Sequence, residues 1–424
     1  MSTAARFPIA RTRLDNGLRV AVCPDRGVPV VAVNLWYGVG AAHDPAGRSG
    51  AAHLCEHLMF DGSRHVRSGE HQLLVHRAGG SGNATTGYDR TNYFTQAPTG
   101  ALDLVLWLEA DRMASAAQGV TPAALDTQRR VIGQEKEQRR AAGPAANGVQ
   151  AALRELLPAA HPYRRAPIGS VSDLAETTVA EVSDFHGRYY RPANAVLSVV
   201  GDVDPDEALG LAHRYFGDVQ GVSAAGPADP APAHGSGPGR AALTGHDLIQ
   251  YVFLLPADDA ATGRDLDAAE IALDVLAGGA YARLYRRLVI SGLAAQVTAS
   301  VSRLAGVSFG TLTARPAPGR DSSALSAAIE TAIEDVAQFG PTDAELAIAR
   351  ARLEHGWLLR VGNRIGRADE LSRLAWRAGD PGLLNERLPA LDAVTVRDVT
   401  RAARNWLAVP TTEVAATELV RSAT

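Results

Sequence analysis

The stretch "GAAHLCEHLMF", residues 50–60, places two histidines four positions apart, with a glutamate directly before the second. Ser49 is a suitable N-cap residue, and the alanines and leucines favour a helix, so we expect a short helix here. On that helix His53 and His57 lie one turn apart, and Glu56 projects from the same side. Two imidazoles in this arrangement are able to bind one metal ion, with Glu56 placed to take a proton from a metal-bound water.

The order H-x-x-E-H is that of the inverted zincins. The alternative is two ordinary helix histidines beside a surface carboxylate. Since a catalytic zinc site needs a third protein ligand, the motif alone does not decide between these interpretations.

A candidate third ligand lies in the segment 121–144, which begins with Thr-Pro and ends with Gly-Pro and therefore predicts one long amphipathic helix. Glu135 follows three and four residues after the last two members of the apolar stripe, so it should share the buried face, whereas Glu137 should face solvent. A carboxylate on an apolar face needs a cation. An arginine partner is the alternative explanation, but together with the histidine pair zinc is the stronger one. The expected stripe consists of Ala124, Leu125, Val131 and Ile132.

An ordered set of further stretches resembles the pitrilysin and mitochondrial-processing-peptidase family of inverted zincins. The resemblance covers nearly the whole chain and implies that His53, His57 and Glu135 hold one Zn²⁺ per chain, with Glu56 as the general base. The stretches that carry it are "DPAGRSGAAHLCEHLMFDGS", "GSGNATTGYDRTNYFTQAP", "LWLEADRM", "QRRVIGQE", "HPYRRAPIG", "FHGRYYRPANAVLSVVGDVDPDE" and, less closely, "VLAGGAYARLYRRLVISGLAAQVTAS".

The sequence departs from this family in two places. Where the family usually has a second glutamate, seven residues before the ligand glutamate, this chain has Gln128, so support of the metal site from the second shell should be weaker or different. In the C-terminal half the family has an Arg and a Tyr that bind substrate and stabilise the tetrahedral intermediate. The corresponding residues here are Leu288 and Ala295, which have no side-chain donor.

The resemblance and these departures together imply a zinc metalloendopeptidase subunit that cuts peptides or unfolded segments, including precursor or leader peptides. In two-chain family members one subunit brings the zinc motif and the other the Arg/Tyr pair. We therefore expect a heterodimer with a homologous partner that carries this pair. The alternatives are a self-sufficient homodimeric zinc peptidase and a non-catalytic scaffold subunit of the same fold.

The segment 80–96, "GSGNATTGYDRTNYFTQ", predicts a β-hairpin from its glycines and its threonine and aromatic residues. On propensity alone it is a hairpin like many others. The family resemblance implies that part of it is an edge strand beside the zinc, on which a substrate peptide adds as a further strand. The implied substrate-binding residues are Asn83, Ala84, Thr85 and Thr86.

The chain has 424 residues, which exceeds what one core usually organises, so two domains are expected. Both halves alternate strand and long helix patterns, which predicts an α+β fold. The family resemblance implies two related mixed-sheet-plus-helix domains that face each other across a chamber. We expect an N-terminal zinc-binding domain at 1–218, a Pro/Gly/Ala-rich linker at 219–241 and a C-terminal peptidase-like domain at 242–424.

Composition narrows the function further. A net charge of −4 gives no basic field for nucleic acid, and no stretch has membrane-spanning length. The N-terminal residues lack a long apolar core, so a cytoplasmic location is the expectation. Two cysteines do not make a disulfide framework, and Cys55 is expected to be a small buried residue on the other face of the metal helix.

Overall fold

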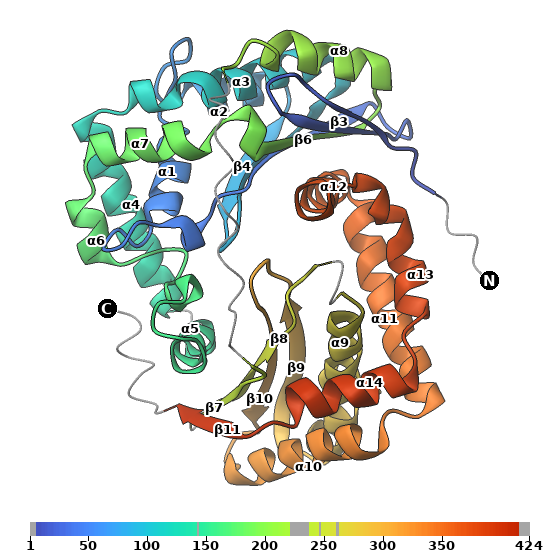
Figure 1. Ribbon diagram of the computed structural model, residues 1–424. Coiled ribbons are helices and arrows are strands. Elements are labelled where there is room, and N and C mark those ends of the chain that lie inside the picture. Colours follow the sequence, from blue (N-terminus) through green and yellow to red (C-terminus); the bar gives the residue numbers. More distant parts are fainter. Residues whose placement is uncertain (1–5, 142–143, 221–236, 246, 260–262, 415–424) are drawn as a thin grey trace. The chain divides into compact units, whose positions relative to one another are not determined.

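A computed structural model describes residues 6–141, 144–220, 237–245, 247–259 and 263–414. The chain divides into two compact units. The first unit comprises residues 1–135, 166–228 and 358–387, and the second comprises 136–165, 229–357 and 388–424. Each unit combines one sheet with helices, which confirms the expected two-domain α+β fold (Figure 1).

The first unit contains a six-stranded sheet in the order β1-β2-β6-β3-β5-β4. Only β2 and β6 pair in parallel, and the other neighbours are antiparallel. Strand β4 ends the order and is therefore an edge strand. The strands are β1 (Ala10–Arg13), β2 (Arg19–Pro24), β3 (Val30–Tyr37), β4 (Ser81–Thr86), β5 (Thr91–Pro98) and β6 (Ala195–Gly201). The helices are α1 (Ala51–Leu58), α2 (Glu70–Arg77), α3 (Leu102–Ser115), most of α4 (Pro122–Ala141), α6 (Val171–Glu176), α7 (Val179–Tyr189), α8 (Pro205–Phe216) and α12 (Arg364–Ala378).

Both faces of this sheet are covered, as the alternation along β3 shows. Val33 and Leu35 belong to the main core, into which α1 and α3 also pack. Asn34 and Trp36, on the other face, meet α12 instead, where Trp36 packs against Ala375. In Figure 1, α3 and α8 lie on one side of this sheet and α12 on the other.

The second unit contains a five-stranded sheet in the order β11-β7-β8-β10-β9, in which only β11 and β7 are parallel. Tyr251 and Phe253 of β8 join a core with α9 and α10. Gln250 points to the opposite face, toward Gly148 of α5. The strands are β7 (Arg240–Thr244), β8 (Ile249–Leu255), β9 (Ala294–Ser302), β10 (Ser308–Pro316) and β11 (Thr411–Val414). The helices are α5 (Pro144–Leu156), α9 (Gly263–Ala277), α10 (Ser323–Phe339), most of α11 (Asp343–Gly362), α13 (Arg387–Asp392) and α14 (Val396–Ala402).

The units exchange two segments relative to the domains expected at 1–218 and 242–424. Helix α5, from the N-terminal half, packs on β7 and β8, and α12, from the C-terminal half, packs on β3 and β6. The expected linker 219–241 lies largely outside the described residues, and its last two residues already belong to β7, so that boundary was wrong. Among the helices that the structure describes, none is long and apolar enough to cross a membrane.

Candidate metal centre

Helix α1 presents the H-x-x-E-H residues from a buried position. Every residue of the helix except His57 is buried, and His57 is half-buried. The prediction that Ser49 is the N-cap was wrong. Gly50 occupies that position, with a positive φ of 94°. Asp44 satisfies the first turn instead, since its carboxylate accepts from the N–H of Gly50 at 2.7 Å and from that of Ala52 at 2.9 Å. A carboxylate at a helix N-terminus also interacts favourably with the helix dipole.

Helix α4 brings Glu135 to the two histidines. Its Oε2 lies 3.6 Å from His53 Nε2 and 3.8 Å from His57 Nε2. A tetrahedral zinc with bonds of about 2.0–2.2 Å has ligand atoms about 3.3–3.6 Å apart, so both distances from Glu135 are within a few tenths of an ångström of the separation that one ion requires. Two neutral nitrogens and one carboxylate oxygen are also a donor set that zinc uses in catalytic sites.

Glu56 belongs to the same cluster. Among the residues that the structure describes, potential ligand atoms of His53, Glu56 and His57 lie within 4.8 Å of one another. Two carboxylates therefore compete for the role of third ligand. We assign that role to Glu135, because one of its oxygens is close to both Nε2 atoms, whereas an oxygen of Glu56 is already bound to Thr86.

The surroundings of Glu56 suit a group that exchanges protons. Thr86 of β4 donates its hydroxyl hydrogen bond to Glu56 Oε2 at 2.5 Å. Burial raises the pKa of the Glu56 carboxyl above its usual value, while the Thr86 hydrogen bond and the charges of His57 and Arg90 act in the opposite direction. A raised pKa brings a carboxylate closer to the range in which it accepts and returns a proton near neutral pH.

Gln128 lies seven residues, about two helical turns, before Glu135 on the same face of α4. Its Oε1 is 3.2 Å from His57 Nδ1, on the side of the ring opposite to Nε2. A hydrogen bond from Nδ1–H to this oxygen leaves Nε2 free for a metal ion. Gln128 therefore contacts a candidate ligand directly, as the sequence led us to expect, and it does so without charge.

The prediction that Val131 belongs to the apolar stripe of α4 was wrong. Val131 is 41% exposed, whereas Leu125 and Ile132 are buried. The inward face consists of the buried Leu125 and Ile132 and the half-buried Gln128 and Glu135, which recur at three- and four-residue intervals, and position 131 falls outside this face. Glu137 is exposed, as expected.

The four expected substrate-binding residues form part of edge strand β4. Asn83 through Thr86 pair with β5 in the register Asn83↔Phe94 to Thr86↔Thr91, and β4 has no neighbour on its other side in the described sheet. Arg90, in the turn to β5, donates to the main-chain oxygen of Thr85 at 2.7 Å and also to its hydroxyl. The strand thus carries Thr86, which binds Glu56, and no further strand pairs with it in the described sheet, although its Ala84 N–H donates to Asn83 Oδ1 at 2.8 Å.

The positions expected to lack an electrophile do lack one. Leu288 is fully buried in the core of the second unit, and Ala295 is exposed on edge strand β9. Arg287, next to Leu288, is exposed on the same helical turn, Tyr285–Val289.

Three other histidines follow α1 without joining the cluster. His65 bonds Asp111, His71 is buried against Arg112, and His76 is exposed. Desolvation and the charge of Arg112 lower the pKa of His71 to about 2. Cys55 is fully buried, as expected, and burial raises its pKa to about 12, which keeps the thiol protonated.

Comparison with known families agrees with this geometry. The family model "Insulinase (Peptidase family M16)" matches residues 19–161, which contain both α1 and Glu135, and "Peptidase M16 inactive domain" matches residues 176–353. The chain belongs to peptidase family M16. The family resemblance inferred from the sequence is therefore confirmed.

Similar M16 proteins extend over different parts of this chain. The zinc protease PqqE of Helicobacter pylori is 33% identical over 204 residues, which cover 48% of this M16 chain and 45% of PqqE, so the match spans less than half of that relative. An uncharacterized zinc protease of Mycobacterium tuberculosis is 28% identical over 412 residues, 95% of this chain and 92% of that protein. The crystal structure of a protease from Helicobacter pylori superposes with a TM-score of 0.87 at 25% identity and covers 97% of this chain and 100% of that one.

Proposed function

We propose that this M16 chain is a zinc metalloendopeptidase subunit that hydrolyses peptides or unfolded segments. One observation carries the proposal: Glu135 Oε2 lies 3.6 and 3.8 Å from the Nε2 atoms of His53 and His57, with Glu56 beside them. Three converging ligands and an adjacent carboxylate are the groups that the catalytic site of a zinc hydrolase requires.

Each residue of the cluster has a role in this mechanism. His53, His57 and Glu135 would hold a zinc ion, which would supply a water molecule of lowered pKa and polarisation of the peptide carbonyl. Glu56 accepts the proton that the water loses and passes it to the leaving amine. Thr86 donates to Glu56 in the ionised state, and its oxygen is able to accept from the protonated acid, so the carboxyl keeps a partner in both states.

The substrate would bind along β4. An extended peptide that pairs with the outer side of β4, along Asn83, Ala84, Thr85 and Thr86, would continue the sheet through main-chain hydrogen bonds once the Asn83 side chain leaves the Ala84 N–H. Thr86 then fixes the distance between the added strand and Glu56. Recognition through the main chain selects for extended, unfolded segments and only weakly for side chains, which suits precursor or leader peptides.

A homologous partner would complete the site. The first unit supplies metal ligands and a base, but Leu288 is buried and neither Leu288 nor Ala295 has a polar side chain, so neither side chain stabilises the tetrahedral intermediate. A partner with the Arg/Tyr pair would supply those donors in a heterodimer. A homodimer with a different electrophile is the alternative, and the exposed Arg287 is its nearest candidate. The expected cytoplasmic location stays a prediction.

Hydrolysis of a quenched-fluorescent peptide library by the purified, zinc-loaded chain tests these proposals. The chain is assayed alone and mixed with a candidate partner that bears the Arg/Tyr pair, with Glu56→Gln as the control. We expect cleavage in the mixture and only background for the chain alone. Cleavage by the chain alone would contradict the heterodimer and favour the homodimer.

A non-catalytic scaffold is the second candidate function. It is favoured by the loss of both donors at positions 288 and 295 and by the match of 176–353 to the inactive-domain model. Retention of all four residues of the zinc cluster argues against it. A chain that binds no zinc and stays inactive with every partner would support the scaffold.

A further inference from the structure

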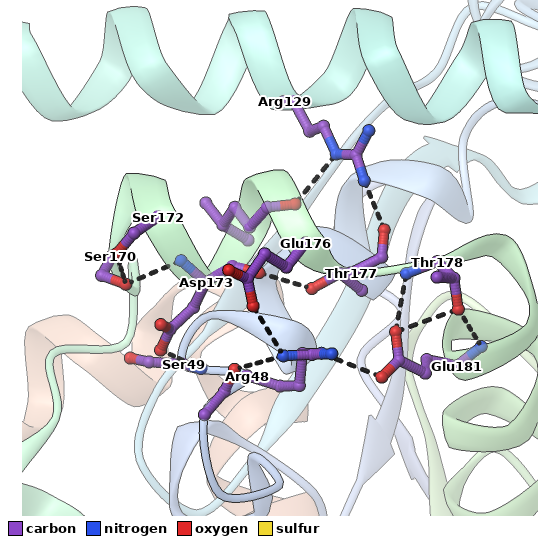
Figure 2. Close-up of polar contacts among 12 residues, drawn as sticks. Arg48, Ser49, Arg129, Ser170, Ser172, Asp173, Glu176, Thr177, Thr178 and Glu181 are labelled. Carbon is purple, nitrogen blue, oxygen red and sulfur yellow. Dashed lines mark hydrogen bonds and ion pairs between the residues drawn. The ribbon is translucent and has the colours of Figure 1, made fainter.

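A polar network joins the helix that carries Glu135 to the segment that precedes the helix with the histidines. Its centre is the segment 169–181, which contains α6 and the start of α7 and which we name the α6 bracket. Figure 2 shows Arg129 above the bracket and Arg48 and Ser49 below it. These partners lie 45 to 133 positions apart in sequence.

On one side, Arg129 of α4 binds the C-terminal end of α6. Its guanidinium donates to the main-chain oxygen of Leu174 at 2.9 Å and to that of Thr177 (Figure 2). Carbonyls at a helix C-terminus lack partners within the helix, and a cation there interacts favourably with the helix dipole. Arg129 directly follows Gln128, and its side chain leaves α4 on the side next to the metal-facing stripe.

On the other side, the bracket binds the residues directly before α1. The Asp173 carboxylate accepts from the N–H of Ser49 at 2.9 Å, and Arg48 pairs with Glu181 at 2.9 Å and with Glu176 at 3.3 Å. Glu181 is itself fixed, because it forms a capping box with Thr178 at the start of α7.

The two backbones also touch at a pair of glycines. A Cβ on Gly169 would lie 2.4 Å from the Cα of Gly50, and both residues have positive φ angles, 75° and 94°. No residue with a side chain fits there without a shift. The start of the bracket and the N-cap of α1 are therefore in direct contact, three residues before His53.

We propose that the α6 bracket sets the position of α4 relative to α1 and thereby holds Glu135 at the distance from His53 and His57 that zinc requires. Arg129 and Asp173 are its positioning residues. This inference rests on the zinc site of the proposed function and assigns residues outside that site to its geometry.

The ordinary alternative is that these contacts are surface ion pairs of little consequence. That explanation suits the pair of Arg48 with Glu176, whose side chain is 73% exposed. Arg129 also forms such a surface pair, with Asp126 at 2.6 Å, but both Arg129 and Asp173 bind main-chain groups in partly buried positions and link separate elements. A group that hydrogen-bonds a metal ligand typically changes metal affinity by about 10–100-fold, and the lower end sets the scale here because Arg129 and Asp173 reach the ligands only through main-chain contacts.

The test measures zinc affinity by competition with a chromogenic chelator, with no reference to catalysis. Arg129→Met keeps the aliphatic part of the side chain and removes the donors. Arg130→Met is the matched control, since Arg130 is exposed and its hydrogen bonds go to Asp126 and Thr127 within α4. We expect Arg129→Met and Asp173→Ala each to weaken zinc binding by about tenfold or more and Arg130→Met to leave it unchanged.

The double variant adds a readout that general destabilisation would not mimic. If both residues act through one bracket, Arg129→Met combined with Asp173→Ala should weaken zinc binding little more than the stronger single variant. Circular dichroism of the zinc-free forms verifies folding, and Arg48→Met, at the more exposed contact, provides a milder variant with a smaller loss in the same direction.

The outcomes separate the two proposals. Zinc affinity unchanged in both Arg129→Met and Asp173→Ala, or fully additive losses, would overturn the bracket and leave the proposed function intact. A wild-type chain that binds no zinc would overturn the proposed function and the bracket with it.

Discussion

The two units contain the same arrangement of three antiparallel strands, but the helices before the edge strands carry different kinds of residue. Strands β3, β5 and β4 of the first unit follow the same order as β8, β10 and β9 of the second, and in each the edge strand is preceded by helix. In the first unit two helices come before that strand, and the earlier one, α1, carries two histidines and a glutamate, of which His53 and Glu56 are buried and His57 is half-buried. In the second it is α9, whose buried residues are apolar except for Asp267.

The turns after the edge strands show the same contrast. Arg90 follows β4 and binds the main-chain oxygen of Thr85, beside the base. Arg303 follows β9 and pairs with Asp258 at 3.3 Å, with Glu270 at 2.5 Å and with Asp267. These carboxylates raise the pKa of Arg303 against the effect of burial. At this position the second unit neutralises three carboxylates with Arg303, whereas in the first unit Glu56 and Glu135 lie beside the two histidines.

The largest effect is expected at Glu56. Glu56→Gln should lower peptide hydrolysis by about 10²–10⁴-fold, the usual contribution of a general base, because the amide cannot accept the proton. Zinc content should stay at the wild-type level, since Glu135 is the third ligand. Turnover assays together with metal analysis check both parts. Loss of zinc in this variant would mean that Glu56 is a ligand.

The next effect falls on the second unit. Arg303→Met leaves three carboxylates without their cation and should destabilise this unit by about 3–5 kcal/mol, the typical result of breaking a buried ion pair. Hydrogen exchange should show lost protection in β8 to β10 with unchanged zinc affinity. Arg315→Met, an exposed residue of β10, is the control. A loss of zinc affinity in Arg303→Met would contradict the separation between the charged cluster of the second unit and the zinc site of the first.

A smaller effect is expected where this chain departs from its family. Gln128→Glu should tighten zinc binding by about tenfold, because a charge-assisted hydrogen bond at His57 Nδ1 makes the other ring nitrogen a stronger ligand. Gln134→Glu, exposed on the same helix, adds the same charge away from the site. Equal affinities in the two variants would show that the contact at His57 does not tune the metal.

The smallest effect concerns stability against pH in the second unit. Hydrogen bonds from Arg283, with further help from Thr342, lower the pKa of Glu345 from 4.5 to about 2. A depressed folded-state pKa stabilises the fold above pH 4.5, and this contribution is lost as the pH falls toward 2. Glu345→Gln should therefore lower the melting temperature at pH 6, and the difference from wild type should shrink between pH 5 and 2. A constant difference would contradict the assignment; the exposed Glu334→Gln is the control.

Helical geometry relates His53, Glu56 and His57 of α1, whereas the resemblance to the family is what connected Glu135 of α4 to them in one predicted site. Four-residue spacing brings His53 and His57 together, and the apolar stripe directs Glu135 inward. Val131 was misjudged because an apolar residue next to the stripe does not have to be buried. The exchange of α5 and α12 between the units was not predicted, since linear patterns carry no information on which sheet a helix covers.

The residues that support the site from outside could not be predicted from the sequence, for a related reason. Asp44, Arg129 and Asp173 are common residue types whose partners are main-chain groups, and those partners are fixed only by the fold. Gly50 and Gly169 both lie within motifs of the family, which marked them as candidates for a structural role. That role, the close contact between their backbones, becomes visible only in the structure.

The most direct test of the central claim, that α1 and α4 together hold one zinc ion in the first unit, is native mass spectrometry of the zinc-loaded chain beside Glu135→Ala. The account predicts one zinc per wild-type chain and none retained by the variant at the same free zinc concentration. Full retention of zinc by Glu135→Ala would contradict it, because α1 would then hold the ion without α4.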